Sequence, residues 1–355
     1  MDYEINHGFN DVDGMIDFLK QMEQDTTWIT DIQVNQIETS YDPDLGCRLS
    51  YGAAEYPIWT EVAMPTLERR SGDTAKGHKL MDEEQIMASM NNYWYLHPEK
   101  DKATMMIRGD KVALLASDRY VYIPQSELVR LVVKHLNTNH ADKWRFVGGL
   151  YSPELTTAQF AVQDAITDRF KRDWANSGLA PSILDNADVI ITIQTSDTEQ
   201  SAARLYGNLK LRASEMSLGQ PVVTAHRNSE RGAVNEFNRK LSEIDLAISD
   251  EFDKLSQLMS VTVYSPQMAM RRAMKSSGMT KVSVKACREY DDQVSGSFGS
   301  KPETAFLIYM TLHGVLDTSI GHGFSDAQKW NMITAIHGLV NKDWTKLDKA
   351  ATVIL

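Results

Sequence analysis

The clearest pattern of apolar and polar positions begins with two apolar runs, Ala103–Arg108 and Lys111–Ala116. They are separated by Gly109-Asp110, and glycine takes a positive φ without steric cost, so the pair predicts a β-hairpin with a type II′ turn. Pro124-Gln125-Ser126 then precedes apolar residues at helical spacing up to Leu136. Together these segments predict a ββα unit.

Upstream of this unit, the periodicity predicts one helix followed by short strands. Asp11–Gln24 places its apolar residues on one helical face, whereas Trp28–Ile37 alternates as a strand does. The acidic turn Asp42–Gly46 leads into a returning strand. Asp82, with Gln85 three residues later, is typical of a capping box at the start of another helix.

Downstream of the unit, we expect alternating strands and helices. Lys143–Val147 predicts a strand, and Ser152-Pro153 is expected to begin a helix that continues to Trp174. The β-branched run Asp188–Gln194 predicts a central strand, and Pro221–Thr224 predicts another. Ser201–Leu218, between these two strands, fits either a helix or a loop.

The longest helical pattern covers Glu230–Met259 and predicts a rod of about 45 Å. Such a helix needs a partner, either the sheet of its own chain or the same helix of another subunit, so we expect a homo-oligomer. Ser295–Ser300 is rich in glycine and serine and predicts a linker. Two helices, Pro302–Leu316 and Ser325–Val340, are expected to follow it.

These elements predict an α+β fold. It contains a mixed or antiparallel sheet with a β-hairpin-helix unit, one long amphipathic helix and a C-terminal helical pair. We expect an acidic N-terminal α/β segment over residues 1–100, a central α+β core over residues 101–294, and a C-terminal helical subdomain over residues 301–355.

The composition of the 355 residues, 42% apolar and 24% charged, is that of a globular protein and not of a disordered one. The N-terminus has no signal-peptide pattern, and no run of residues is apolar enough to span a membrane. Cys47 and Cys287 are too few for a disulfide framework, which favours a reducing compartment. We therefore expect a cytoplasmic protein without a membrane partner.

The net charge of −11 is unevenly distributed along the chain. Residues 1–60 hold twelve acidic side chains against two basic ones, a net charge of −10. Leu255–Arg288 holds no acid and six cations. An uncompensated run of cations is typical of a phosphate-binding surface. A solvated basic face that neutralises the acidic N-terminal segment explains the same pattern equally well.

Catalytic motifs give no site. Tyr206 and Lys210 have the Tyr-x-x-x-Lys spacing of short-chain dehydrogenases, but no glycine-rich nucleotide-binding turn precedes them. His313 and His337 precede glycine on the two C-terminal helices; with a third ligand they would hold a metal, although packed histidines are the favoured interpretation. We therefore expect no catalytic residue, no cofactor and no metal site.

Ser117-Asp118-Arg119-Tyr120 has two interpretations. Arg119 and Tyr120 would present a guanidinium and a ring to a phosphate and a base. In the favoured structural interpretation, Asp118 caps the turn and Tyr120 packs behind the hairpin.

The order of several features resembles the phage/plasmid-like protein family, an uncharacterised domain family common on prophages and conjugative plasmids. The residues that carry the resemblance are Trp28, Ser117-Asp118-Arg119-Tyr120 with Glu127-Leu128, and His226-Arg227 ahead of Glu230–Met259. The chain departs from the family in its acidic first sixty residues and in lacking a His-Thr-Gly after the arginine. The resemblance implies a mobile-element origin and a bacterial host, and it implies no activity.

Charge and resemblance together lead to the hypothesis of a non-enzymatic phage or plasmid protein that binds nucleic acid, with single-stranded DNA as one candidate. Alternatively, the acidic segment docks on a host or phage protein, as in counter-defence proteins, or the chain is an enzyme whose site no motif marks. The expected nucleic-acid-binding residues are Arg271, Arg272, Lys275, Lys281, Lys285 and Arg288, with Arg204, Lys210, Arg212, Arg227 and Arg119.

Overall fold

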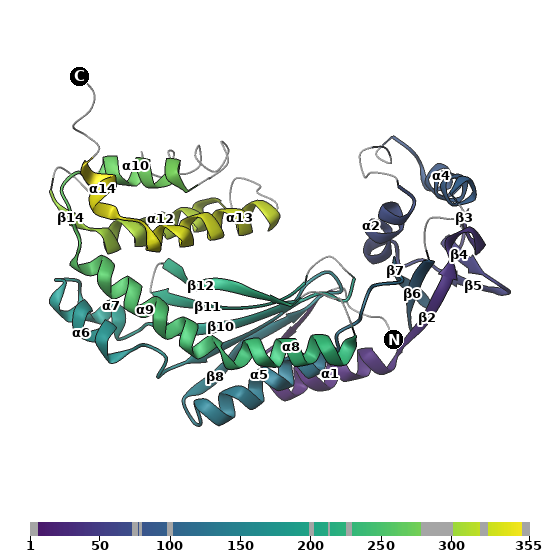
Figure 1. Cartoon of the computed structure of the whole chain (residues 1–355). Helices are drawn as coiled ribbons and strands as arrows, with labels where there is room; N and C mark the ends of the chain where they lie inside the picture. The colour runs from purple at the N-terminus through teal and green to yellow at the C-terminus, as the bar shows by residue number, and fades with distance from the viewer. Residues whose placement is uncertain are drawn as a thin grey trace, which may run out of the picture.

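A six-stranded antiparallel sheet forms the centre of the larger part of the chain (Figure 1). The computed structural model describes residues 6–72, 77, 80–97, 102–198, 202–211, 214–224, 229–277, 301–319 and 326–349. In spatial order the strands are β1 (His7–Phe9), β8 (Trp144–Tyr151), β9 (Thr156–Val162), β10 (Asp188–Thr195), β11 (Ala203–Leu211) and β12 (Ser214–Thr224).

One face of this sheet is apolar and is covered by helices (Figure 1). Alternate residues such as Ile191 and Leu209 point to this face and are fully buried. Gly207 lies on the same face, where an added Cβ would come within 3.0 Å of Ile248 on a covering helix, so the approach of that helix requires glycine. The covering helices are α1 (Val12–Gln24), α5 (Gln125–Asn139), α8 (Glu230–Ser242) and α9 (Ile244–Ser260), with α6 (Asp168–Asn176) and α7 (Pro181–Leu184) beside them.

The N-terminal lobe, residues 26–117, is inserted between α1 and α5 and stands at one end of the sheet (Figure 1). It has its own core of buried side chains, including Trp94 and Leu115. One of its sheets contains β2 (Thr26–Gln33), β6 (Lys102–Arg108) and β7 (Lys111–Ser117); the other contains β3 (Ile37–Asp42), β4 (Gly46–Tyr51) and β5 (Ala54–Pro57). Its helices are η1 (Val34–Gln36), α2 (Thr60–Arg70) and α4 (Glu83–Leu96).

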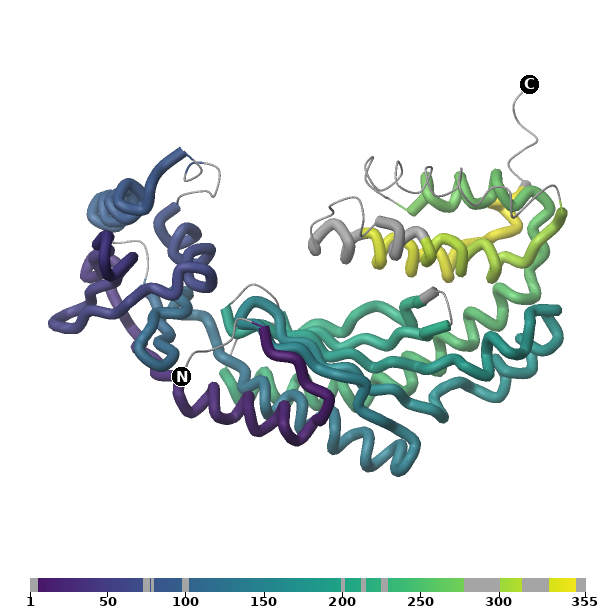
Figure 2. The backbone as a smooth tube through the Cα atoms, turned by 180° about the vertical axis from the view of Figure 1, so that it is seen from behind, coloured from purple at the N-terminus to yellow at the C-terminus, as the bar shows by residue number. Residues whose placement is uncertain are grey.

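The C-terminal helical layer follows α9 and lies toward the other end of the sheet (Figure 2). Its helix α12 contacts both α9 and the edge strand β12, which ties the layer to the sheet. The layer contains β13 (Thr262–Val263), α10 (Pro266–Ser276), β14 (Glu303–Thr304), α12 (Ala305–Ser319), α13 (Asp326–His337), η3 (Gly338–Asn341) and α14 (Trp344–Lys349). Over the residues that the structure describes, no helix has both the length and the apolar character needed to cross a membrane.

The α+β class and several local predictions are confirmed. Gly109 has a φ of +62° between β6 and β7, as the hairpin turn requires. Asp11 caps α1, and Asp82 forms the capping box of α4 with Gln85. The strand β10 lies inside the sheet, paired on both sides. The undecided segment 201–218 contributes β11 and part of β12, which form a strand pair.

The helix expected from Ser152-Pro153 to Trp174 is wrong in its first half. Thr156–Val162 forms β9, which pairs with β8 and β10, and the helix α6 begins only at Asp168. The apolar residues of this segment also fit alternation, because Ala158 and Phe160 are buried with one intervening half-buried residue. Residues 156–162 therefore form a strand because they fill the position between β8 and β10. In this segment, only the spacing of Phe170 and Trp174 is helical.

The long helix over Glu230–Met259 is broken at Glu243. The backbone N–H of Glu243 turns back to the carbonyls of Lys240 and Leu241, which ends α8, and α9 starts at the next residue with a different direction (Figure 1). Phe237 and Phe252 nevertheless belong to one core, so the break redirects the helix without changing the buried face. Both helices pack on the sheet of their own chain.

The hairpin β6–β7 also crosses the expected domain boundary at residue 100. Trp28 of β2 pairs with Met106 of β6, so the hairpin completes a sheet of the N-terminal lobe and does not belong to the central sheet. The helix of the same ββα unit, α5, instead packs on the central sheet beside α1. The unit therefore spans both parts of the protein.

His313 and His337 lie buried on α12 and α13, where packing is their main role. The His313 ring stands edge-on to Tyr309 at 4.7 Å, and neither of its nitrogens has a hydrogen-bond partner within the described residues. Burial lowers the pKa of His313 to about 3 and that of His337 to about 4. Both rings are thus neutral at neutral pH, and His337 Nδ1 lies 3.4 Å from Glu251 Oε1.

These neutral histidines predict a loss of stability in acid. The unfolded chain protonates a histidine below about pH 6.5, whereas the folded chain keeps His313 neutral down to about pH 3, so the free energy of unfolding falls as the pH decreases below 6.5. We expect His313→Leu to remove about 3 kcal/mol of this loss between pH 6.5 and pH 4. Urea denaturation of wild type and variant across this range measures it; parallel pH profiles would contradict it.

Candidate functional site

A buried ion pair joins the N-terminal lobe to the central sheet. Arg108 is the last residue of β6, and Asp197 follows β10. Arg108 Nη1 lies 2.6 Å from Asp197 Oδ2, and the two side chains are 0% and 2% exposed. Arg108 and Asp197 can both stay charged at this buried position because each neutralises the other. Burial of an unpaired charge is very costly.

The ion pair is surrounded by further hydrogen bonds. Tyr151 of β8 lies with its hydroxyl 2.6 Å from Arg108 Nη1 and 3.2 Å from Asp197 Oδ2. Gln125 at the start of α5 donates to Asp197 Oδ1 at 2.7 Å, and the Tyr120 hydroxyl donates to the backbone carbonyl of Asp197 at 3.2 Å. The segment between β7 and α5 is thereby attached to the end of the central sheet.

The protonation states of this cluster follow from its burial. Burial disfavours the Arg108 cation, but the charge of Asp197, the neighbouring Tyr151 and Tyr122, and the hydrogen bond to Asp197 together outweigh it, so the pKa of the guanidinium is raised. Burial, with the same carboxylate, raises the pKa of the Tyr151 hydroxyl, which stays neutral. The cluster therefore has a fixed charge distribution at physiological pH and offers no group poised for proton transfer.

Beside the cluster, α1 supplies the cap that α5 lacks. Pro124 is the N-cap residue of α5 and has no side-chain hydroxyl or carboxylate. Glu23 of α1 accepts hydrogen bonds from the Ser126 backbone N–H at 2.9 Å and from its hydroxyl at 2.6 Å. Burial raises the pKa of Glu23 although these bonds favour its charged form. This contact fixes α5 next to α1 where the chain returns from the lobe.

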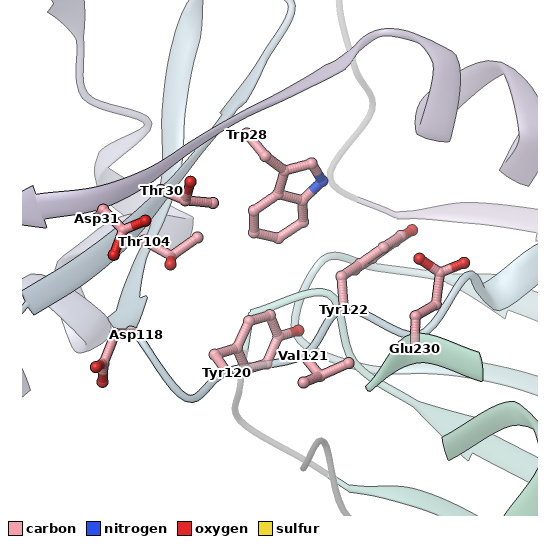
Figure 3. A pocket seen from close by; sticks show the side chains of 9 residues that line it. All are labelled: Trp28, Thr30, Asp31, Thr104, Asp118, Tyr120, Val121, Tyr122 and Glu230. Atoms are coloured by element: carbon pink, nitrogen blue, oxygen red, sulfur yellow. The ribbon is translucent and has the colours of Figure 1, made fainter. Parts of the chain in front are cut away.

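An aromatic pocket of about 320 Å³ opens between the lobe, the segment that follows β7 and the start of α8 (Figure 3). The Trp28 ring lies 6.1 Å from the Tyr120 ring and 5.2 Å from the Tyr122 ring, measured between centroids. Figure 3 shows the three rings gathered on one side, with carboxylates around them. The pocket is lined by Trp28, Thr30, Asp31, Thr104, Asp118, Tyr120, Val121, Tyr122 and Glu230.

The aromatic pocket combines π faces with negative charge. Asp31, Asp118 and Glu230 are exposed, and Asp31 is paired with Lys102 at 3.2 Å. Ring faces and carboxylates both attract a cation, whereas the carboxylates repel a phosphate. The pocket therefore suits an ammonium or guanidinium group better than a nucleotide.

The second candidate surface is the face of the central sheet opposite the helices, which we call the polar sheet face. In Figure 2, which is turned by 180° from Figure 1, α1 and α5 run below the strands of the sheet. The strand register places Gln159, Thr192 and Tyr206 in one row across β9, β10 and β11. The members of the polar sheet face are Thr157, Gln159, Thr192, Gln194, Arg204, Tyr206, Asn208 and Lys210.

Charge on the polar sheet face differs between its two ends. Lys210 is exposed and stands in register with Asp188 on one side and Glu215 on the other. Arg145 Nη2 lies 2.7 Å from Asp188 Oδ2, so acid and base balance at this end. Arg204, at the opposite end of β11, is flanked in register by Gln194 and not by an acid. The two cations of β11 therefore have different neighbours in the strand register.

Tyr206 and Lys210 lie on a strand and not on a helix. Four residues of β-strand span about 13 Å, so the ammonium is too far from the phenol to activate it. Burial, followed by the charge of Glu215, raises the pKa of Tyr206. A dehydrogenase-like role for this pair is excluded by this geometry.

The structure distributes the expected nucleic-acid-binding residues over separate elements. Arg271, Arg272 and Lys275 lie on α10, and Arg272 donates to the carbonyls of Leu347 and Asp348 at the end of α14. That arginine therefore has a structural role as a helix C-cap partner. Arg204 and Lys210 lie on β11, and Arg119 is exposed after β7 beside the aromatic pocket. Lys281, Lys285, Arg288, Arg212 and Arg227 lie outside the described residues.

The ion pair and the aromatic pocket are not predicted by the sequence. Arg108 ends an apolar strand next to a turn, where a cation is usually exposed, and its partner lies 89 residues away. Tyr120 was expected to pack behind the hairpin, and it is 8% exposed there. The burial of Arg108 can be recognised only in the folded structure, where the lobe contacts the central sheet.

Comparison with protein-family models, curated proteins and solved structures finds no match for this chain.

The ion pair predicts strong coupling between Arg108 and Asp197. Arg108→Met leaves a buried carboxylate without its cation, and we expect it to lower the free energy of unfolding by about 3–5 kcal/mol. Asp197→Asn in the same chain should restore part of this loss, because the remaining amide carries no charge. Urea denaturation of the two single variants and the double variant measures the coupling energy.

A matched control is the exposed pair on the same strand. Lys102 Nζ lies 3.2 Å from Asp31 Oδ1, with side chains 50% and 76% exposed. Lys102→Met should cost less than about 1 kcal/mol. Additive effects of the Arg108 and Asp197 variants, within about 0.5 kcal/mol, would show that the buried pair does not act as a unit.

Proposed function

We propose that this protein binds single-stranded nucleic acid on the polar sheet face. The observation that carries the proposal is the placement of Arg204, Tyr206 and Lys210 on one face of β11, with Tyr206 next to Arg204 and Asn208 between Tyr206 and Lys210. A ring between two cations suits a strand whose bases stack while its phosphates meet the charges. Neighbouring amides, such as Gln194, add hydrogen-bond donors that tolerate any sequence.

The proposed binding surface is the polar sheet face and not the basic stretch Leu255–Arg288. Within the described part of that stretch, Arg272 is engaged with α14 and only Arg271 and Lys275 are exposed. The cations of β11 instead share one face with an aromatic ring. With two or three phosphate contacts, a single strand should lose about 10-fold in affinity between 50 and 200 mM salt.

The test is a titration of a fluorescent oligothymidine of about 20 nucleotides, followed by anisotropy at both salt concentrations. We expect binding at 50 mM salt, weaker binding to a duplex of the same length, and the modest salt dependence given above. The double variant Arg204→Glu, Lys210→Glu should abolish binding, because it reverses both charges on the face. Tyr206→Ala should weaken binding by about 1–3 kcal/mol through loss of stacking.

Two control variants make the result specific. Lys111→Glu reverses an exposed charge at the hairpin tip of the N-terminal lobe and should leave affinity unchanged. Arg271→Glu with Lys275→Glu tests α10 as the alternative site. No binding at 50 mM salt rejects the function, whereas loss of binding only in the α10 variant rejects the polar sheet face.

A second candidate function rests on the aromatic pocket. Its three rings and its carboxylates match a lysine or arginine side chain from a basic segment of a partner protein. This matches the alternative in which the acidic N-terminal part of the chain recognises a host or phage protein. The ring of Trp28 is the central contact, because it faces both tyrosines.

For this second function, we expect arginine-rich peptides to bind and Trp28→Ala to weaken them by about 10-fold, as loss of a desolvated cation–π contact of about 1–2 kcal/mol implies. Calorimetric titration with an arginine-rich peptide and with a glutamate-rich peptide of equal length measures the effect. Trp94→Phe, in the core of the same lobe, is the control for general destabilisation. Equal binding of both peptides would exclude a cation-selective pocket.

A further inference from the structure

Two histidines and an aspartate converge where α5 ends and α9 begins. His135 lies in the last turns of α5, His140 is the residue that ends this helix, and Asp245 lies in the first turn of α9. His135 Nε2 is 3.0 Å from Asp245 Oδ2, and His140 Nε2 is 3.2 Å from Asp245 Oδ1. Both imidazoles therefore point their Nε2 atoms at the carboxylate of Asp245.

The other nitrogens of both rings have partners of their own. His140 Nδ1 lies 2.7 Å from Asp164 Oδ1, and Lys143 Nζ lies 3.3 Å from the other oxygen of Asp164. The side-chain nitrogen of Asn139 lies 3.1 Å from His135 Nδ1 and 3.3 Å from His135 Nε2, so the supporting carboxylate is a feature of His140 and not of His135. A carboxylate on the far nitrogen of a histidine fixes the ring and its tautomer, an arrangement typical of histidines that bind metals.

His140 lies between two carboxylates, with Nδ1 next to Asp164 and Nε2 next to Asp245. A divalent cation at this place would bind the Nε2 lone pair and an oxygen of Asp245. The contact of Nδ1 with Asp164 would be unchanged and would keep the ring in place.

We propose that His135, His140 and Asp245 form a binding site for a divalent transition metal, with zinc as the matching ion. This proposal is independent of nucleic-acid binding and concerns the opposite, helical side of the sheet. Within the described residues, this is the group of three potential ligands whose donor atoms all lie within 4.8 Å of one another. His313 and His337 are not part of such a group.

Distances and charge both favour zinc. Metal–ligand bonds of about 2.0–2.1 Å in a tetrahedron place neighbouring ligand atoms about 3.3 Å apart. Each histidine nitrogen lies near this distance from its own oxygen of Asp245, at 3.0 Å from Oδ2 for His135 and 3.2 Å from Oδ1 for His140. Two imidazole nitrogens and one carboxylate oxygen form a donor set that zinc accepts readily, whereas calcium and magnesium prefer oxygen alone. The two carboxylates, Asp164 and Asp245, compensate the double positive charge.

The site is also open enough to complete a coordination sphere. The His135 and His140 side chains are 8% and 11% exposed, whereas Asp245 is 32% exposed. The ion would thus be held from the protein side and reached from solvent beside Asp245. Three protein ligands leave the fourth tetrahedral position for water, as in zinc sites that are not purely structural.

The test uses the full-length protein after treatment with a chelator. Cobalt(II) is the first probe, because a tetrahedral site gives it intense visible absorption, and zinc should then remove that absorption by competition. We expect one equivalent of cobalt to bind to the wild type. Saturating zinc should also raise the melting temperature, because it binds the folded state only.

Substitutions assign the site. His140→Gln and His135→Gln should each weaken zinc binding at least about 100-fold, and Asp164→Asn, which removes only the supporting carboxylate, about 10–100-fold. His97→Gln is the matched control: His97 ends α4 as His140 ends α5, and its ring contacts the carbonyl and the ring of Tyr93. Circular dichroism confirms that each variant is folded.

The outcomes are decisive in both directions. Absence of cobalt absorption in the wild type, or zinc binding that is equally tight in the His135, His140 and control variants, overturns the proposal. A cobalt spectrum typical of octahedral coordination retains the ligands but rejects the tetrahedral zinc assignment. If His140→Gln does not fold, Asp164→Asn still tests His140 as a ligand, because this variant removes the carboxylate next to His140 Nδ1. Zinc binding should then be weaker by the factor given above.

Discussion

The arrangement of the lobe on the sheet depends on one buried ion pair, Arg108 with Asp197. A pair of this kind is not an efficient source of stability, because removing both charges from water costs about as much as their attraction returns. Its effect is geometric: any displacement of the lobe would separate the charges in a dry environment and leave two unpaired ions. The hydrogen bonds of Tyr151, Gln125 and Tyr120 to the same pair extend this constraint to β8, α5 and the wall of the aromatic pocket.

The constraint matters because the N-terminal lobe is an insertion. The chain leaves α1 at residue 25 and returns to α5 at residue 125, and these two helices lie next to each other on the sheet. Glu23 and Ser126 close this junction from the helical side, and Arg108 and Asp197 close it from the sheet. Both contacts flank the segment around Tyr120, which lines the aromatic pocket. Because residues of the lobe line this pocket, a displacement of the lobe would change the contacts of a ligand bound there.

Local signals in the sequence were sufficient for the local structure and insufficient for the sites. The Gly109-Asp110 turn and the Asp82 cap involve residues within three positions of each other, so their physics is contained in short windows. The break at Glu243 escaped detection because the apolar period continues through it, and β9 escaped because its burial depends on strands on both sides. Of the candidate site residues, Arg204 and Lys210 were identified by charge, but their common face with Tyr206 needed the strand assignment. Arg108, His135 and His140 gave no signal, because their partners are distant in sequence or belong to another helix.

The uneven charge of the chain acquires a different meaning in the folded protein. Several N-terminal acids serve local structure: Asp11 caps α1, Asp42 accepts two backbone N–H groups in its turn, and Glu23 caps α5. These carboxylates are neutralised by helix ends and turns, so the net charge of residues 1–60 overstates the negative potential available to a partner. Arg272 is similarly engaged at the end of α14. On the two candidate surfaces, acids lie around the three rings of the pocket, and the cations Arg204 and Lys210 lie along β11. Since a phosphate is repelled by the first group and attracted by the second, the fold itself keeps the two candidate ligands apart.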